Sequence, residues 1–417
     1  MLARLGWVLR GLQRRLWFRA TLFSVAGVAT ALLALLLRDH IPTTLPAKVG
    51  ADAVDKILTI IASSMLAVTT FSLSTMVTAY NAASSVTPRA YPLLLEDSTT
   101  QNALATFLGS FLFSLVGIIA LSTGLYGDNG RVVLFAVTLV VILLIVFTLL
   151  RWIDHLSRLG QLDATSDSIE DAARHSLQRW LAQPYLGGVA APVDEPARGR
   201  PVMADRTGYL QRVDMPLLAD LCGDQGRLRL AALPGAFLDP AQPLLWVEGL
   251  PPEKDQRLRA AFTLDARRVH DQDPRFGLTV LGEIATGALV PSRSDSGTAI
   301  AILGRAQRLL TALTEPREAV EPRYPRIEVP ELSLDDLFDD FFLPVGRDAA
   351  PLVEVGMRLQ KALARLAVQG DARIRRECLR HSRLALARAE ATLGQAEDRV
   401  ILQQLAADVE RLCTARQ

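Results

Sequence analysis

Four long stretches without charged side chains precede residue 152. They run from about Trp17 to Leu37 with only Arg19 near the start, between Lys56 and Arg89, between Asp97 and Asp128, and between Arg131 and Arg151. The hydrocarbon core of a bilayer is crossed by roughly 20 apolar residues in a helix. The pattern therefore predicts a domain of four transmembrane helices over residues 1–156.

The charges that flank these stretches predict their orientation. Five arginines and no acid precede the first stretch, namely Arg4, Arg10, Arg14, Arg15 and Arg19. Positive residues favour the cytoplasmic side. The first apolar run is too long for a typical signal peptide and no clear cleavage site closes it, so we expect a retained anchor. An even number of spans then places both termini in the cytoplasm, at the bacterial inner membrane.

The rest of the chain is water-soluble in composition and predicts a cytoplasmic α+β domain. Helical spacing of apolar residues and a following tract rich in Pro and Gly indicate an amphipathic helix and linker over residues 157–206. Alternating apolar residues predict a small β region over residues 207–250. Residues 251–417 have a helical pattern. The predicted fold class is thus a membrane α-helical domain followed by this α+β domain.

The second span is unusually rich in hydroxyl groups. At about 100° per residue one set of its polar positions shares a sector of about 80°, and this set comprises Ser63, Thr70, Ser74, Thr78, Asn81 and Ser85. Several copies of such a face around an axis would line a pore. Small and hydroxylated residues also allow two helices to pack closely. The sequence leaves both interpretations open.

Two neighbouring features bear on this choice. The third span carries Ser110 and Ser114 on one face, and close packing is the favoured interpretation there. Arg89, in the loop after the second span, either contacts a lipid phosphate or carboxylate at a pore mouth or lies at the membrane interface as an ordinary arginine. No ionisable residue lies in the middle of a span, which argues against a proton pump or an ion-coupled transporter.

One soluble segment, residues 270–310, suggests a polar site. Asp273 before Pro274 is typical of a helix start, and Asp295 can cap the next helix. The plain interpretation is two capped helices joined by a tight loop. The alternative is a pocket for a cation or charged ligand, formed by Asp273, Glu283, Arg293 and Asp295.

Composition removes several classes of function. Half of the residues are hydrophobic and the mean hydropathy is +0.24, which agrees with a membrane protein. A net charge of +1 argues against nucleic-acid binding. Cys222, Cys378 and Cys413 are odd in number and widely spaced, so neither disulfides nor a metal site is expected. No nucleotide-binding or hydrolase motif occurs. We therefore expect no enzyme and no cofactor.

Several segments resemble a known family, the bacterial predicted membrane proteins grouped as domain of unknown function 2254. They are IASSMLAVTTFSLSTMVTAYNAASSVTPRAYPLLLEDSTTQNALATFLGSFLFSLVG in the spans, GYLQRVD and PGAFLDPAQPLLWV in the β region, and QDPRFGL with ALVPSRSDSGTA in the helical region. The resemblance extends almost from end to end. It implies four spans and a cytoplasmic C-terminal domain, and it implies no settled activity.

The chain departs from the family pattern in the most polar soluble segment. Gly287, Val290, Ser294 and Ser296 stand where the family usually has Arg, Ser, Asn and Pro. Asp273, Pro274, Asp295 and Thr298 remain, so the helix caps fit the family better than the pocket does.

These observations favour a homo-oligomeric ion channel or pore in the lipid bilayer. The second span would line the path for inorganic ions, and the cytoplasmic domain would regulate it. The alternative is a non-conducting membrane-anchored scaffold or sensor whose cytoplasmic domain binds a partner or ligand. In a scaffold the hydroxyl face would be packed dry within one subunit.

Overall fold

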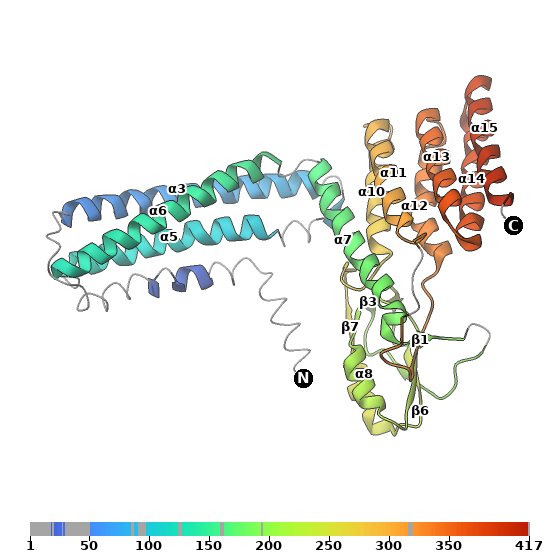
Figure 1. Ribbon diagram of the computed structural model, residues 1–417, viewed down its shortest axis with the longest axis horizontal. Helices are drawn as coiled ribbons and strands as arrows, with labels where there is room; N and C mark the ends of the chain where they lie inside the picture. Colours follow the sequence, from blue (N-terminus) through green and yellow to red (C-terminus); the bar gives the residue numbers. More distant parts are fainter. Residues whose placement is uncertain are drawn as a thin grey trace. The chain divides into compact units, whose positions relative to one another are not determined.

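The protein divides into two compact units, Met1–Thr165 (unit 1) and Ser166–Gln417 (unit 2). The computed structural model (Figure 1) describes residues 18, 21–26, 28–29, 51–84, 87–90, 97–123, 127–158, 162–192, 195–315 and 320–415.

Unit 1 contains three described helices of membrane-spanning length. They are α3 (Ala51–Ser84), α5 (Ser98–Ser122) and α6 (Gly127–Arg158), with a short 3₁₀ helix, η2 (Pro88–Ala90), after α3. Apolar spans of sufficient length cover Ala53–Asn81, Ser98–Ser122 and Arg131–Ser157. The second, third and fourth predicted spans are thereby confirmed as apolar helices. The first, Trp17 to Leu37, falls largely outside the described residues.

Side chains of all three helices form the core of unit 1. Leu58 of α3, Phe113 of α5 and Leu134 of α6 meet in one buried cluster. A second cluster brings Met65 and Phe107 together with Trp152, and the indole Nε1 of Trp152 donates to the Ser72 hydroxyl over 2.9 Å. A buried hydrogen bond between two span helices satisfies groups that lipid could not.

A five-stranded mixed sheet stands at the centre of one half of unit 2. Its strands are β1 (Val189–Ala190), β2 (Arg200–Met203), β4 (Arg227–Leu230), β6 (Pro243–Glu248) and β8 (Ile327–Val329). Their order is β1-β8-β4-β6-β2. β8 runs parallel to both β1 and β4, whereas β6 is antiparallel to β4 and β2.

A three-stranded antiparallel sheet shares the core of the first. Its strands β5 (Phe237–Leu238), β3 (Gly208–Val213) and β7 (Phe262–Asp265) have the order β5-β3-β7. Leu210, Leu228 and Leu245, with side chains of α8 (Met215–Cys222), belong to one apolar cluster that joins both sheets. Three short helical segments complete this half: η3 (Pro184–Gly187), η4 (Pro252–Lys254) and α9 (Asp255–Arg259).

The other half of unit 2 is helical. It comprises α7 (Leu162–Ala182, in unit 2 from Ser166), α10 (Phe276–Leu289), α11 (Ser296–Thr311), α12 (Leu334–Asp348), α13 (Val353–Gln369), α14 (Ala372–Thr392) and α15 (Ala396–Thr414). Contacts join α10, α12 and α14 in one row and α11, α13 and α15 in another. Figure 1 shows these six helices standing side by side as successive pairs.

The strands of unit 2 extend beyond the predicted β region, residues 207–250. β1 and β2 lie in the predicted linker, and β7 and β8 lie within the segment predicted to be helical. These strands are two to four residues long, too short to produce a readable alternation. They are stabilised by hydrogen bonds to neighbouring strands and by the apolar core that the two sheets share.

A buried histidine in this helical half should make the stability of the protein pH-dependent. His381 on α14 is 2% exposed and packs against the rings of Phe338 and Phe342, with ring centres 5.9 and 5.6 Å away. Burial, aided by the charge of Arg380, lowers its pKa from 6.5 to about 4. The unfolded chain therefore takes up a proton between these values that the folded chain excludes, and stability is lost as the pH falls.

We predict that the full-length protein loses roughly 2 kcal/mol of unfolding free energy through His381 between pH 7.5 and pH 5. Calorimetry in an uncharged detergent at both values measures the loss. His381→Phe retains a ring that does not titrate and should show a smaller pH dependence. An equal pH dependence in the two proteins would contradict the prediction.

Candidate functional site

The hydroxyl face of the second span lies at the surface of unit 1. Exposed members of this stripe are Ser63, Thr70, Ser74, Thr78 and Asn81 of α3. Ser85 falls outside the described residues. Large apolar side chains, including Leu66 and Phe71, are exposed on either side of the stripe.

The packed face of α3 is opposite to the stripe. Leu58, Met65, Ser72 and Met76 are buried against α5 and α6. At about 100° per residue, Ser72 lies about 180° around the helix from Ser63. Close packing against α5 and α6 therefore does not account for the hydroxyl stripe.

Most of the hydroxyl groups in the stripe donate to the preceding turn. Ser63 donates to the carbonyl oxygen of Thr59 over 2.9 Å, Thr70 to that of Leu66 over 3.0 Å, and Thr78 to that of Ser74 over 3.1 Å. Because these three hydroxyl protons are used within the helix, Ser63, Thr70 and Thr78 present their oxygen lone pairs outwards. The stripe thus presents three hydroxyl oxygens as hydrogen-bond acceptors, beside the hydroxyl of Ser74 and the amide of Asn81.

A polar cluster joins the start of α5 to the end of α6. Asp97 caps α5 by accepting from the amide of Thr100 over 2.8 Å, and its Oδ2 lies 2.8 Å from Nε2 of His155. Burial raises the pKa of Asp97, but hydrogen bonds from His155 and Thr100 outweigh that effect and lower it to about 2. Sequence reasoning missed this cluster. Its signal was a cap residue before the third span and a histidine just after the fourth.

Arg89 follows the second span. It lies exposed in η2, and its amide donates to the Thr87 hydroxyl over 3.3 Å. Its position after α3 agrees with both interpretations given from the sequence.

The four residues of the predicted polar pocket do not come together. Asp273 precedes the first turn of α10, whereas Arg293 and Asp295 follow its last turn. A helix of 14 residues is about 21 Å long. Glu283 is half-buried in the middle of α10. The pocket interpretation is therefore corrected, because the helix that the two aspartates flank also separates them.

The capping interpretation of the same segment agrees with the geometry. Asp273 Oδ1 accepts from the amides of Arg275 and Phe276 over 3.0 and 3.1 Å. Asp295 accepts from the amide of Thr298 over 3.0 Å at the start of α11. Each carboxylate satisfies amides that the first helical turn leaves without a partner.

Asp273 is also the centre of a buried polar junction. It is 1% exposed, and Arg268 holds its Oδ2 over 2.9 Å through Nε and 2.7 Å through Nη2. Burial raises the pKa of Asp273, and Arg268 and the two amides oppose that rise. The guanidinium of Arg268 lies over the Phe276 ring at 5.0 Å. A buried carboxylate held by four donors fixes the groups that carry them.

His270 lies against the same ring. Its ring centre is 4.5 Å from that of Phe276, and burial together with Arg268 lowers its pKa to about 4. The imidazole is therefore neutral at neutral pH. Its Nε2 is a buried atom without a hydrogen bond within the described part of the chain.

Gly235 closes the junction from the side of the sheet. Its φ of +100° is in the region that favours glycine, and a Cβ there would lie 2.6 Å from Cγ of Asp273. The turn after β4 and the start of α10 can therefore meet only because this position has no side chain. These two segments are among those on which the family resemblance rests.

Neighbouring residues connect the junction to other parts of unit 2. The amide of Val213 on β3 donates to the side chain of Gln272 over 2.9 Å. Arg275 forms ion pairs with Asp336 and Asp340 of α12 at 2.5 and 2.8 Å. A Cβ at Gly277 would lie 2.8 Å from the Cα of Ala173, so the backbones of α10 and α7 approach closely.

A second buried carboxylate attaches α7 to α11. Glu170, whose side chain is 4% exposed, accepts from Arg174 over 2.6 Å, from Arg305 over 2.9 Å and from Arg308 over 2.7 Å. Burial raises its pKa, but the hydrogen bonds from Arg308 and Arg305 outweigh that effect, and the pKa is lowered overall. Three donors on one ionised acid form a strong anchor for a single helix.

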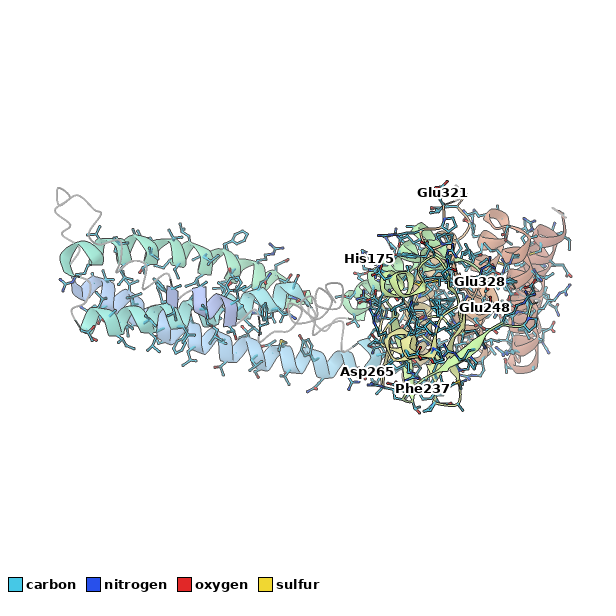
Figure 2. The ribbon with its side chains drawn as sticks, turned by 90° about the horizontal axis from the view of Figure 1, so that it is seen from below. His175, Phe237, Glu248, Asp265, Glu321 and Glu328 are labelled. Atoms are coloured by element: carbon cyan, nitrogen blue, oxygen red, sulfur yellow. The ribbon has the colours of Figure 1, made fainter. Side chains whose placement is uncertain are left out.

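The outer face of the five-stranded sheet carries a small cavity of about 80 Å³. It is lined by charged residues of both signs, among them Glu248 of β6 and Glu328 of β8, which Figure 2 labels. Arg229 lies opposite Trp246 across the strands and 3.8 Å from Glu328. The charges largely neutralise one another, which is typical of the solvated face of a sheet.

No metal centre is evident among the residues that the structure describes, because no three His, Cys, Asp or Glu side chains gather there. Cys222, Cys378 and Cys413 are buried, and burial raises the pKa of each thiol.

The contact between Gly235 and Asp273 yields a stability prediction. Gly235→Ala should lower the unfolding free energy by roughly 2 kcal/mol more than Gly223→Ala, because it disturbs a buried ion pair as well as straining the backbone. Gly223 is a matched control with positive φ and open space around it. Thermal unfolding followed by circular dichroism measures both, and equal losses would show that the Asp273 contact is unimportant.

Comparison with known proteins identifies the family. Residues 13–365 match the family described as predicted membrane protein (DUF2254). Since this match covers most of the chain, the protein belongs to that family, and the resemblance of its sequence segments is confirmed.

Individual relatives are more distant. The chain is 28% identical over 238 residues to uncharacterized proteins of Mycobacterium tuberculosis and Mycobacterium bovis. The match covers 53% of this chain and 45% of each relative, so the chain spans about half the length of the curated relatives it matches. No solved structure matches the chain significantly.

Proposed function

We propose that this member of the predicted membrane protein family assembles into a homo-oligomeric pore in the bacterial inner membrane. In the assembly α3 faces the axis, small inorganic ions pass along its hydroxyl stripe, and unit 2 lies in the cytoplasm as a regulatory domain. The observation that carries the proposal is the position of the stripe, which is exposed and opposite to the packed face of α3.

The energetics of a bilayer favour covering such a stripe. Lipid tails offer no partner for hydroxyl oxygens or for the amide of Asn81, and unsatisfied polar groups in hydrocarbon are costly. The apolar side chains of Leu66 and Phe71, on either side of the stripe, suit lipid or a neighbouring subunit. If several copies of α3 surrounded a water-filled axis, water would hydrate the oxygen acceptors of the stripe.

Passive conduction fits the span chemistry better than pumping. The middles of α3, α5 and α6 contain no Asp, Glu, Lys, Arg or His. Pumps and coupled transporters generally use an ionisable group within the membrane. A row of oxygen acceptors can replace part of the hydration shell of an ion without changing its own charge.

A non-conducting scaffold is the alternative use of the same stripe. In that case copies of α3 would pack directly together, with hydroxyl groups bonding across a dry interface. The two assemblies differ in whether water reaches the stripe.

Cysteine accessibility tests this difference. We predict that cysteines at Ser63, Thr70, Ser74 and Thr78 react with water-soluble thiol reagents, because a thiol must ionise to react and water along a pore allows this. The protein is reconstituted in vesicles after Cys222, Cys378 and Cys413 are replaced by Ala, and the labelled fraction is followed by mass spectrometry.

Matched controls are available on α6. Leu143 and Phe147 are 70% and 64% exposed in a single chain but lie off the stripe. Cysteines there should contact lipid and react at least roughly tenfold more slowly. Equal inertness of both sets, under several conditions that could open a pore, would favour the scaffold.

The proposal also predicts an oligomer. Light scattering of detergent-solubilised protein should give a protein mass of at least two 45.4 kDa chains. A stable monomer would remove the pore proposal, because one copy of α3 cannot surround an axis.

A further inference from the structure

Two of the three cysteines come together in the last helical hairpin of unit 2. Cys378 lies on α14 and Cys413 on α15, and their side chains are 0% and 4% exposed. Their wide spacing in the sequence gave no reason to expect a pair. The chain turns back between α14 and α15, however, and this turn makes the two residues neighbours.

The register of the hairpin places the two cysteines at the same level. It follows from two side-chain contacts between the helices, Glu390 with Gln403 and Arg383 with Glu410. Near the turn, Ala389 of α14 and Leu402 of α15 share one buried cluster. Cys378 and Cys413 each lie about three helical turns further from the turn, on the same faces of their helices. They therefore oppose each other across the helix contact.

A shared carbonyl group brings the two sulfurs to one place. The Cys413 Sγ donates to the carbonyl oxygen of Arg375 over 3.3 Å. In a helix the side chain three residues further on leans back over that carbonyl. Cys378 has this position relative to Arg375. The two thiols also interact electrostatically, because the pKa of Cys378 is raised first by burial and then by the charge of Cys413.

The surroundings of the pair favour a bond between the sulfurs over a bound metal ion. No third His, Cys, Asp or Glu side chain completes a metal site with them in the part of the chain that the structure describes. A soft monovalent ion held by two thiolates would leave a negative charge in this buried contact. A disulfide is neutral, so burial does not oppose its formation.

We propose that Cys378 and Cys413 form an oxidisable thiol pair, which peroxide converts into a disulfide that fastens α15 to α14. Cys413 reacts first, because it lies in the last turn of α15, where a helix opens most readily. Its sulfur attacks one oxygen of hydrogen peroxide, the O–O bond breaks, and a sulfenic acid and water result. The Cys378 sulfur then displaces the hydroxyl group, which leaves as water with the thiol proton. The two thiols lose two electrons, and one peroxide becomes two water molecules.

Burial makes this pair slow to react, because the thiolate is the reactive form. The thiols therefore persist in a reducing compartment, and the disulfide forms under sustained oxidation. Since α15 packs against both α13 and α14, the new bond would hold the last helix of unit 2 in its place. The pair is distinct from the hydroxyl stripe and does not require that the protein conduct ions.

Peptide mapping of the full-length protein tests the pair. The protein is treated with hydrogen peroxide in an uncharged detergent and denatured, the remaining thiols are alkylated, and linked peptides are identified by mass spectrometry before and after reduction. We expect a disulfide between Cys378 and Cys413 as the main linked product. Cys222 should remain unlinked, because it is buried in the core of the two sheets. In protein unfolded with guanidinium chloride all three pairings should appear.

A shifted thiol separates proximity from reactivity. The double variant Cys413→Ala, Thr414→Cys moves the thiol about 100° around α15, to an exposed position. This thiol should react with peroxide more readily, yet its linkage to Cys378 should be at least roughly tenfold lower, because a disulfide needs its two Cβ atoms about 4 Å apart. Equal linkage in this variant, or no link between Cys378 and Cys413 in the folded native protein, would overturn the proposal.

Discussion

The buried carboxylate of Asp273 is the constraint on which the arrangement of unit 2 depends. One ionisable group receives two helix amides and a guanidinium, while a glycine turn closes over it. Removing water from a carboxylate is costly unless each oxygen gains partners. The donors must therefore remain in place, and through them the start of α10 keeps a fixed position relative to Arg268, which follows β7.

A chain of polar contacts extends from this point through the helical half. Arg275 forms an ion pair with α12, and Gln272 accepts a hydrogen bond from β3. At Gly277 the backbone of α10 packs closely against α7. Glu170 then fixes α7 to α11. Apolar packing supplies most of the favourable free energy in such a domain. The polar contacts specify which helix faces meet, because a shifted register would leave buried charges without partners.

The sequence predicts the coarse organisation well and the local sites less well. Charge-free runs locate α3, α5 and α6 because length and apolarity alone decide a span. Residues 251–417 were predicted to be helical, and α10 to α15 lie there. Short strands such as β1 were not predicted, because their pairing depends on partners that are distant in the sequence.

Asp273 was identified correctly as a cap, but its grouping with Asp295 ignored the length of the intervening helix. The pairing of Asp97 with His155 depends on how two helices pack, which a local pattern does not encode.

The pairing of β1 with β8 determines when the five-stranded sheet can form during synthesis of the chain. Val189 lies beside Glu328, so the first and last strands of the five-stranded sheet are neighbours although α10 and α11 are encoded between them. During synthesis this sheet cannot close until the ribosome has passed residue 329, by which time α3, α5 and α6 have been synthesised. Pairings between such distant segments form slowly, because the intervening loop must first be ordered. Unit 2 of the nascent chain thus exposes an open sheet edge while it is already linked to α3, α5 and α6, and a chain truncated within α11 would retain that exposed edge.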